Sequence, residues 1–387
     1  LVPAIIAGPG QAALRARLAE PDVLVVTTGQ QPALFTGPLY AVHKALSAAA
    51  LSQVLSARWG RSVVPLFWVA GDDHDFAEAN HAAWLRPDGT LHVETLPDRP
   101  PEAALRPMSR ESLGVGIELA LSALAADLAG LEGHPEVLQW LRAHFRPETT
   151  LGAASGAALA ELLAPLGVLC LDGSHDALKA KGAPVVRRAL EEASGLEAAL
   201  VRRAAALAEA GRNPGVSVGD GATLVMLEGK EGRDRLVLNG AGFRARHGGE
   251  RYGREEILGL LDREPGRFSG NVLLRPVLER FVLPTVAYVA GPGELRYLAL
   301  AEAVYAQLGV SPQLPVPRWS GMLVEPRVDR VLAKFGASLE ELLAPAARLE
   351  SRVARERLPA EAVEAITVLR ASIDREYDAI EAAAVGI

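Results

Sequence analysis

The densest group of reactive side chains follows an apolar run at residues 63–70. Gly71-Asp-Asp-His-Asp-Phe-Ala-Glu-Ala-Asn-His81 places several carboxylates and two histidines where that run predicts the end of a buried strand. A carboxylate beside His74 would raise its pKa and hold its ring, which suits acid–base chemistry. The alternative is structural: Asp72 or Asp73 caps the next turn, and Glu78 favours its N-terminal end.

A second segment joins a strand to a glycine-rich loop. The β-branched run 23–27 leads into Thr28-Gly-Gln-Gln-Pro-Ala-Leu-Phe-Thr-Gly-Pro. Pro38 suits the first position of a helix, and apolar residues then recur at helical spacing: Leu39, Val42, Ala45, Leu46 and Ala49. Glycines let the backbone approach a ligand, and a helix start offers free N–H groups to an anion. We therefore expect a ligand site here, in the same crevice as His74.

These two segments belong to an alternating pattern of strands and helices. Apolar runs at 23–27, 63–70, 168–172 and 285–290 predict strands, and helical spacing is evident at 38–58 and 296–308. Such alternation predicts the α/β class, with a mostly parallel sheet and right-handed crossovers. The sequence does not predict the order of the strands.

We expect insertions within this core. Residues 1–85 and 266–336 form its two halves, and 167–215 contribute a core strand and helices. A mainly helical insertion is predicted at 86–166, with helices near 117–130, 135–145 and 151–164. A small α+β insertion is predicted at 216–265, with strands near 223–227 and 235–238 and a helical stretch at 185–210 before it. Ile366, Ile373 and Ile380 repeat at heptad spacing, so 337–387 is predicted to be a truncated coiled-coil region.

Composition excludes several classes of protein. With 387 residues and 49% hydrophobic content, the chain is expected to be globular rather than disordered. A net charge of −7 without a long basic run argues against a nucleic-acid partner. The single cysteine, Cys170, permits neither a disulfide framework nor a cysteine-based zinc site. We see no signal peptide and no bilayer-length apolar run, so we expect a cytoplasmic protein without a membrane partner.

Taken in order, five segments of the chain resemble the BshC family, the cysteine-adding enzymes of bacillithiol biosynthesis. They are Thr28-Gly-Gln-Gln with Leu34–Tyr40 and Lys44; Phe67–Phe76 with Asn80-His81; Phe268–Pro276; Leu283–Glu294 with Tyr297; and Pro317-Arg318 with Leu323-Val-Glu325. The resemblance implies a Rossmann-like core related to class I aminoacyl-tRNA synthetases, interrupted by insertions and followed by a coiled coil. It also implies a reaction that joins the carboxyl of cysteine to the amine of glucosaminyl-malate.

The resemblance also implies roles for individual residues. Asp72, Asp73 and His74 are the candidate catalytic residues, because they could accept the substrate ammonium or remove its proton. Arg275 and Arg318 could bind the two carboxylates of malate as bidentate partners. The candidate substrate-binding residues are Gln30, Gln31, Tyr40, Asn271, Arg275, Glu294 and Arg318. Hydrogen bonds within the loop, helix capping by Glu294 and structural ion pairs of the arginines are the alternatives.

ATP is the candidate cosubstrate that would activate cysteine. The chain departs from the related synthetases here, because it carries neither a HIGH nor a KMSKS signature. Ala33 also stands where the family often has glycine, and it would restrict a backbone that needs a positive φ. The candidate phosphate-binding residues are Thr36, Gly37, His43, Lys44, Gly291 and Gly293. We expect no metal ion.

Two other functions stay open. A metal-dependent hydrolase would use Asp72, His74 and His81, because carboxylates and histidines suit a divalent ion. A non-catalytic nucleotide-binding or assembly protein fits the missing signatures and the coiled-coil stripe. For the ligase we expect cysteine and glucosaminyl-malate as the small-molecule partners, and a homodimer formed through the coiled coil.

Overall fold

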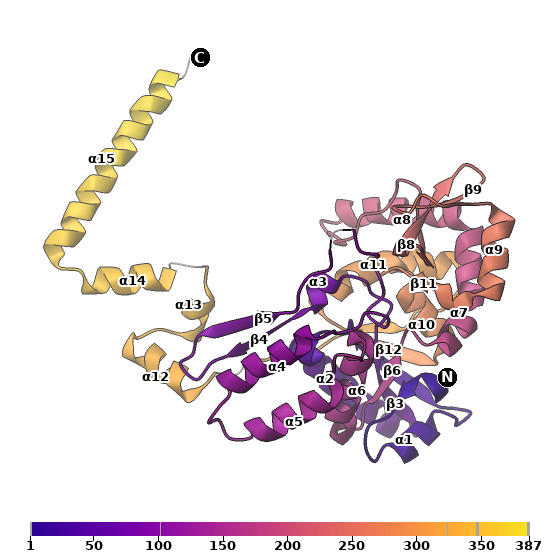
Figure 1. The fold of residues 1–387 in the computed structure, drawn as a ribbon. Coiled ribbons are helices and arrows are strands. Elements are labelled where there is room, and N and C mark those ends of the chain that lie inside the picture. The colour runs from indigo at the N-terminus through magenta and orange to yellow at the C-terminus, as the bar shows by residue number, and fades with distance from the viewer. Residues whose placement is uncertain (1, 101, 323, 346–347, 385–387) are drawn as a thin grey trace. The chain divides into compact units, whose positions relative to one another are not determined.

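The computed structural model describes residues 2–100, 102–322, 324–345 and 348–384. The chain forms two compact units, Leu1–Ser320 and Gly321–Ile387. The first contains both larger sheets and every candidate site residue, and the second is helical (Figure 1). Leu323 of the resemblance and residues 346–347 and 385–387 of the predicted coiled-coil region lie outside the described residues.

A six-stranded sheet forms the centre of the first unit. Every neighbouring pair in the order β1-β6-β3-β2-β12-β13 is parallel except β1 and β6. The strands are β1 (Ile5–Ile6), β2 (Leu24–Gln30), β3 (Val63–Val69), β6 (Leu169–Asp172), β12 (Thr285–Ala290) and β13 (Leu314–Pro317). The four predicted strands and the mostly parallel sheet are confirmed. Because β3, β2 and β12 are neighbours, the polar segments that follow them meet at one edge.

Helices cover both faces of this sheet. On one face, α2 (Tyr40–Trp59) and α6 (Leu151–Leu163) pack with Phe67 and Val69. On the other face, α7 (Asp176–Glu191) and α10 (Arg275–Val282) pack with Val64 and Leu66. All of β3 is buried, and its successive side chains supply both layers because they point to opposite faces of the sheet.

Helix α2 packs through small side chains rather than through the predicted leucines. Leu39 is 56% exposed and Leu46 is 40% exposed, whereas Ala41 and Ala45 are buried. Alanines let the helix approach the sheet closely, which leaves the larger residues at the margin of the contact. The helix begins at Tyr40, so Pro38 lies in the preceding loop and not at the first helical position.

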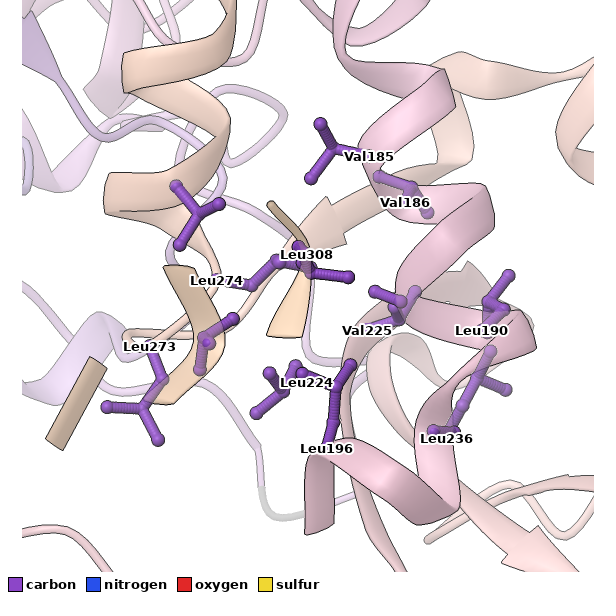
Figure 2. Close-up of a cluster of buried hydrophobic side chains, with 14 of the residues drawn as sticks. Val185, Val186, Leu190, Leu196, Leu224, Val225, Leu236, Leu273, Leu274 and Leu308 are labelled. Carbon is purple, nitrogen blue, oxygen red and sulfur yellow. The ribbon is translucent and has the colours of Figure 1, made fainter. Parts of the chain in front are cut away.

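A second, antiparallel sheet of five strands packs beside the core. Its order is β10-β9-β8-β7-β11, and the two predicted strands of this region are the centres of β7 and β8. Figure 2 shows how valines and leucines of α7 and of α8 (Ala193–Glu209) meet Leu224 and Val225 of β7 (Ala222–Gly229) and Leu236 of β8 (Gly232–Asn239). This cluster fixes the sheet against the core helices. The strands are β7 (Ala222–Gly229), β8 (Gly232–Asn239), β9 (Gly242–Ala245), β10 (Arg251–Tyr252) and β11 (Phe268–Gly270).

The predicted helical insertion contains three helices, and an unpredicted hairpin crosses its expected start at residue 86. Helices α4 (Gly116–Asp127) and α5 (His134–His144) lie side by side, and together with α6 they match the predicted positions (Figure 1). The hairpin of β4 (His81–Leu85) and β5 (Leu91–Thr95) was missed because none of its residues is fully buried, so its hydrophobic pattern is weak. The further helices of this unit are α1 (Ala12–Arg17), α3 (Phe76–Ala79), α4 (Gly116–Asp127), α5 (His134–His144), α8 (Ala193–Glu209), α9 (Arg254–Arg263) and α11 (Pro292–Gln307), with 3₁₀ turns η1 (Val2–Ala4), η2 (Leu34–Thr36), η3 (Ala164–Leu166) and η4 (Pro265–Arg267).

The second unit consists of helices. They are α12 (Pro326–Lys334), α13 (Leu339–Leu343), α14 (Arg348–Arg357) and α15 (Ala360–Ala384). Ile366, Ile373 and Ile380 all lie on α15, and they are 54%, 47% and 64% exposed. The heptad stripe therefore lies on one helix, and the coiled coil stays a prediction. Within the described residues, no helix combines the length and apolar character that a membrane crossing requires.

We predict that Leu66→Ala lowers the free energy of unfolding by about 2–5 kcal/mol, because it leaves a cavity in the centre of the sheet. Leu66 is 0% exposed on β3. The matched control is Leu119→Ala on α4, where the side chain is 73% exposed and the expected change is within about 0.5 kcal/mol. Urea denaturation followed by circular dichroism measures both, and equal changes would contradict this packing.

Candidate functional site

A cavity of about 830 Å³ opens where β2, β3 and β12 end. Segments of the second sheet complete its wall, so the cavity lies between the two sheets. This is the crevice that a parallel α/β sheet is expected to offer to a ligand. Most of the predicted site residues line it, namely Gln30, Gln31, Tyr40, Lys44, Asp72, Asp73, His74, Asn271, Arg275, Gly291, Gly293, Glu294 and Arg318.

Thr36, Gly37 and His43 do not line this cavity. The loop before α2 forms the 3₁₀ turn η2, whose Leu34 is buried in the cluster that contains residues of α4, α5 and α6. His43 instead contacts the ring of Trp319, with ring centroids 5.1 Å apart. The positive φ angles of this loop occur at Phe35, Thr36 and Gly37, whereas Ala33 is extended with φ −148°. The backbone at residue 33 therefore needs no positive φ, and alanine is tolerated there.

The loop after β3 holds its carboxylates in different ways. Asp72 forms an ion pair with Lys179 of α7 at 2.6 Å. The Oδ1 of Asp73 accepts hydrogen bonds from the N–H groups of His74 at 2.7 Å and Asp75 at 3.2 Å. The cap of α3 is Asp75, which accepts a hydrogen bond from the Glu78 N–H. The structural alternative was thus right about a cap in this loop and wrong about which aspartate provides it.

His74 contacts an arginine from the second sheet. The guanidinium of Arg233 on β8 donates to Nδ1 of His74 at 3.0 Å. Burial lowers the pKa of His74, and Arg233 lowers it further, against the opposing effects of Asp73 and Asp75. The neighbouring carboxylates act in the expected direction, but the net shift of this pKa is downward, because burial and Arg233 outweigh them.

Lys44 and Glu294 form an ion pair that links α2 to α11. Lys44 is 1% exposed, and its Nζ lies 2.6 Å from Oε2 of Glu294. Lys44 also donates to the Gly29 carbonyl and to Gln30 Oε1. Burial lowers the pKa of Lys44, and the pairing with Glu294 opposes that shift. Lys44 therefore holds the end of β2 through these contacts, and its charge is balanced by Glu294.

Glu294 serves several partners at once. Its Oε1 accepts from the Tyr288 hydroxyl at 2.6 Å, and its Oε2 accepts from the Gly291 N–H at 2.6 Å. The Gly291 contact completes the capping box of α11. The alternative of helix capping is thus confirmed for Glu294, and both of its carboxylate oxygens have partners within the protein.

The two arginines predicted to bind malate differ in their partners. Arg275 forms an ion pair with the fully buried Glu279 at 2.8 Å, and its guanidinium also lies 5.1 Å from the Tyr288 ring centroid. Arg318 donates to the Trp319 carbonyl and to Ser320 Oγ, and it has no ion pair with a described carboxylate. Arg275 therefore matches the alternative of a structural ion pair, whereas the positive charge of Arg318 remains available to a ligand.

The polar amides at the cavity edge are engaged locally. Gln30 donates to the Tyr40 hydroxyl at 3.3 Å, and Gln31 donates to Glu78 at 2.9 Å. Oδ1 of Asn271 accepts from the N–H groups of Leu273 and Leu274, so its carbonyl oxygen supports the start of α10. These contacts match the alternative of hydrogen bonding within the loops, and they hold the amides at the cavity wall.

Sequence reasoning missed three cations of this cavity, Lys179, Arg233 and Arg235. The two arginines lie at alternate positions of β8, so both side chains face the cavity side of that strand. Arg233 also donates to Ser269 Oγ and to the Gly270 carbonyl, each at 2.9 Å. The alternation Arg-Asp-Arg was a local signal, but the docking of this sheet on the core could not be read from it.

The three residues proposed for a metal-dependent hydrolase do not converge. His81 is exposed on the hairpin strand β4, while Nδ1 of His74 faces Arg233. Among the described residues, no group of three histidine, cysteine, aspartate or glutamate side chains is placed to hold a metal ion. The geometry therefore does not support the hydrolase hypothesis.

The parallel sheet and the cavity at its strand ends define a Rossmann-like α/β protein. Residues 11–319 match the family described as "Bacillithiol biosynthesis BshC, N-terminal Rossmann-like domain". The chain therefore belongs to the BshC family, as the sequence motifs predicted.

Curated relatives support the same family. The chain is 35% identical over 348 residues to the "Putative cysteine ligase BshC" of Koribacter versatilis, which covers 90% of this chain and 64% of that protein. It is 37% identical over 350 residues to the protein of the same name from Heliobacterium modesticaldum, covering 89% of this chain and 62% of the relative. The chain thus spans about three fifths of the length of these relatives.

We predict that Lys44→Met lowers the free energy of unfolding by about 3–5 kcal/mol, because it leaves the partly buried Glu294 without its counter-charge. Adding Glu294→Gln should recover part of this loss, so the double variant loses less than the sum of the single variants. Chemical denaturation of the four proteins measures the coupling.

The control for this cycle is Arg61→Met. Arg61 pairs with Asp22 at the surface, where the side chains are 45% and 89% exposed. We expect a change within about 1 kcal/mol there. Additive effects of Lys44→Met and Glu294→Gln would show that the pair is not coupled.

Proposed function

We propose that this chain is a cysteine ligase, which joins the carboxyl of L-cysteine to the amine of glucosaminyl-malate. The observation that carries the proposal is the cavity between the two sheets, where carboxylates, a histidine and arginines without carboxylate partners face one space. Such groups suit a substrate that carries both an amine and carboxylates. The names of the relatives support the same reaction class.

Arg235 and Arg318 are proposed to bind the malate carboxylates. The Arg235 guanidinium makes no hydrogen bond or ion pair with another described residue, although it lines the cavity. Burial and the neighbouring Arg246 and Arg233 lower the pKa of Arg235. A bound anion would therefore stabilise the charged form of its guanidinium. Guanidinium groups bind carboxylates through paired hydrogen bonds.

Asp73 is proposed to receive the substrate amine and its proton. Asp72 is already paired with Lys179, whereas Asp73 lines the cavity and forms no ion pair within the described residues. An ammonium must lose a proton before its nitrogen can attack the activated carboxyl. A carboxylate positioned by two backbone N–H groups is suited to hold the ammonium and to take that proton.

ATP is proposed as the activating cosubstrate, which would place a good leaving group on the cysteine carboxyl. Of the six predicted phosphate-binding residues, only Lys44, Gly291 and Gly293 line the cavity, and Lys44 is neutralised by Glu294. Gly293 lies in the first turn of α11, with open space where a side chain would be. The proposed phosphate position is therefore the start of α11, and not the loop of Thr36 and Gly37.

The wider setting is part of the same proposal. We propose that the core is related to class I aminoacyl-tRNA synthetases, that the protein acts in the cytoplasm, and that α15 forms a homodimeric coiled coil. The isoleucine stripe on α15 supports the coiled coil.

The direct test incubates the protein with cysteine, glucosaminyl-malate and ATP, and detects the amide product by mass spectrometry. Product that forms only with ATP supports ligation through an activated carboxyl. Product without added ATP would require another activated donor. No product under any condition, with nucleotide still bound, would favour the non-catalytic nucleotide-binding protein.

We predict that Arg235→Met and Arg318→Met each raise the KM for glucosaminyl-malate at least about tenfold, the cost of one charged hydrogen bond. The KM for the dimethyl ester of the malate group should stay unchanged, because the ester carries no charge for these arginines to bind. Arg244→Met is the control, since Arg244 donates only to backbone carbonyls and does not line the cavity. Equal effects on acid and ester would contradict this assignment.

A further inference from the structure

We propose that Arg233 holds His74 as a neutral imidazole with its proton on Nε2, so that His74 donates a hydrogen bond to the reacting carbonyl oxygen. In this assignment, His74 is a catalytic donor and Arg233 is its positioning residue. The catalytic role rests on the proposed ligase function, whereas the protonation state of His74 can be measured without any substrate.

The tautomer follows from the chemistry of the contact. An arginine guanidinium carries only hydrogen-bond donors, and it stays protonated at ordinary pH. The Arg233 nitrogen lies 3.0 Å from Nδ1 of His74, so Nδ1 must be the unprotonated acceptor. The neutral ring then carries its proton on Nε2. Nε2 makes no hydrogen bond to a described residue, and His74 lines the cavity, so this donor is available to a ligand.

Arg233 cannot easily leave this position. Its side chain is anchored by Ser269 and by the Gly270 carbonyl of β11, which hold two of its nitrogens. The backbone of His74 is also fixed on both sides, because its N–H donates to Asp73 and its carbonyl accepts from Arg99 at 3.2 Å. Both members of the contact are therefore preorganised before a ligand binds.

The charges around His74 act in both directions. Arg233 and Arg99 disfavour the imidazolium, while Asp73 and Asp75 favour it. Asp72 in the same loop is paired with Lys179. Burial adds to the effect of the arginines, and the pKa of His74 falls below its ordinary value of 6.5. A pKa lowered from 6.5 favours the neutral imidazole at pH 7, and the contact with Arg233 requires an unprotonated Nδ1.

A neutral N–H donor has a defined use in amide formation. When the amine attacks the activated carboxyl, negative charge develops on the carbonyl oxygen, and a fixed donor stabilises it. In the assigned tautomer His74 has no free lone pair with which to take a proton from the amine. The earlier hypothesis of His74 as the base is therefore replaced, and proton removal falls to a carboxylate of the same loop, Asp73.

The first test is nitrogen NMR of ¹⁵N-histidine-labelled protein, with His74 assigned by comparison with His74→Gln. We expect Nδ1 to appear unprotonated and Nε2 protonated at pH 7, with a midpoint below 6.5. In Arg233→Met the midpoint should rise and the single-tautomer signature should be lost, whereas Arg233→Lys should restore it because lysine also only donates. Arg246→Met, an exposed arginine near the same sheet, should change nothing.

The second test separates a donor from a base by kinetics. His74→Ala removes the donor and should lower kcat about 10²–10³-fold. His74→Gln keeps an N–H donor without a base, and its kcat should stay within about tenfold of the wild type.

Two results would overturn the proposal. One is an unprotonated Nε2 in the wild-type protein at pH 7, and the other is an equal loss of kcat in His74→Ala and His74→Gln. If the wild-type protein forms no product, the ligase function fails, and the NMR measurement still decides the tautomer.

Discussion

The site depends on the hydrogen bonds of the half-buried Arg233 guanidinium. An arginine keeps its charge even where water is partly excluded, so its N–H groups need fixed acceptors. Two acceptors, Ser269 and the Gly270 carbonyl, lie on β11 of the same sheet, and the third is the ring of His74 in the loop after β3. The docking of the second sheet therefore also determines the protonation state of the cavity histidine, because the sheet carries Arg233.

The same rule shapes the other charges of the cavity. Lys44 with Glu294 and Lys179 with Asp72 each join elements that are distant in sequence, and each pair cancels its own charge. Buried pairs of this kind add little net stability, but they fix the geometry of the elements that they join. The charged cavity groups that keep no ion-pair partner among the described residues are chiefly Arg235, Arg318 and Asp73. A ligand with carboxylates at one end and an amine at the other is complementary to that remainder.

Much of the fold could be predicted because β2, β3 and β12 are long apolar runs with polar segments at their ends. The polar segments at those strand ends predicted the position of the cavity and most of the cavity residues that the six-stranded core supplies. The sign of the His74 pKa shift could not be predicted, because its sequence neighbours are acidic, burial lowers the pKa most, and the arginine that lowers it further is 159 residues away. The prediction that the loop of Thr36 and Gly37 lines the cavity was wrong for a similar reason. Leu34 packs into the apolar cluster beside α6, and composition does not reveal that contact.

The second sheet is an insertion in the chain order of the core, yet it supplies the wall that sets the chemistry. Without it, the loop after β3 would leave His74 beside Asp73 and Asp75 in water, where these carboxylates favour the charged imidazolium. The docked sheet brings Arg233 to Nδ1 of the half-buried ring, so the same residue becomes a neutral donor. The apolar cluster of α7, α8 and β7 that holds the sheet is thus also what sets the protonation state of the site.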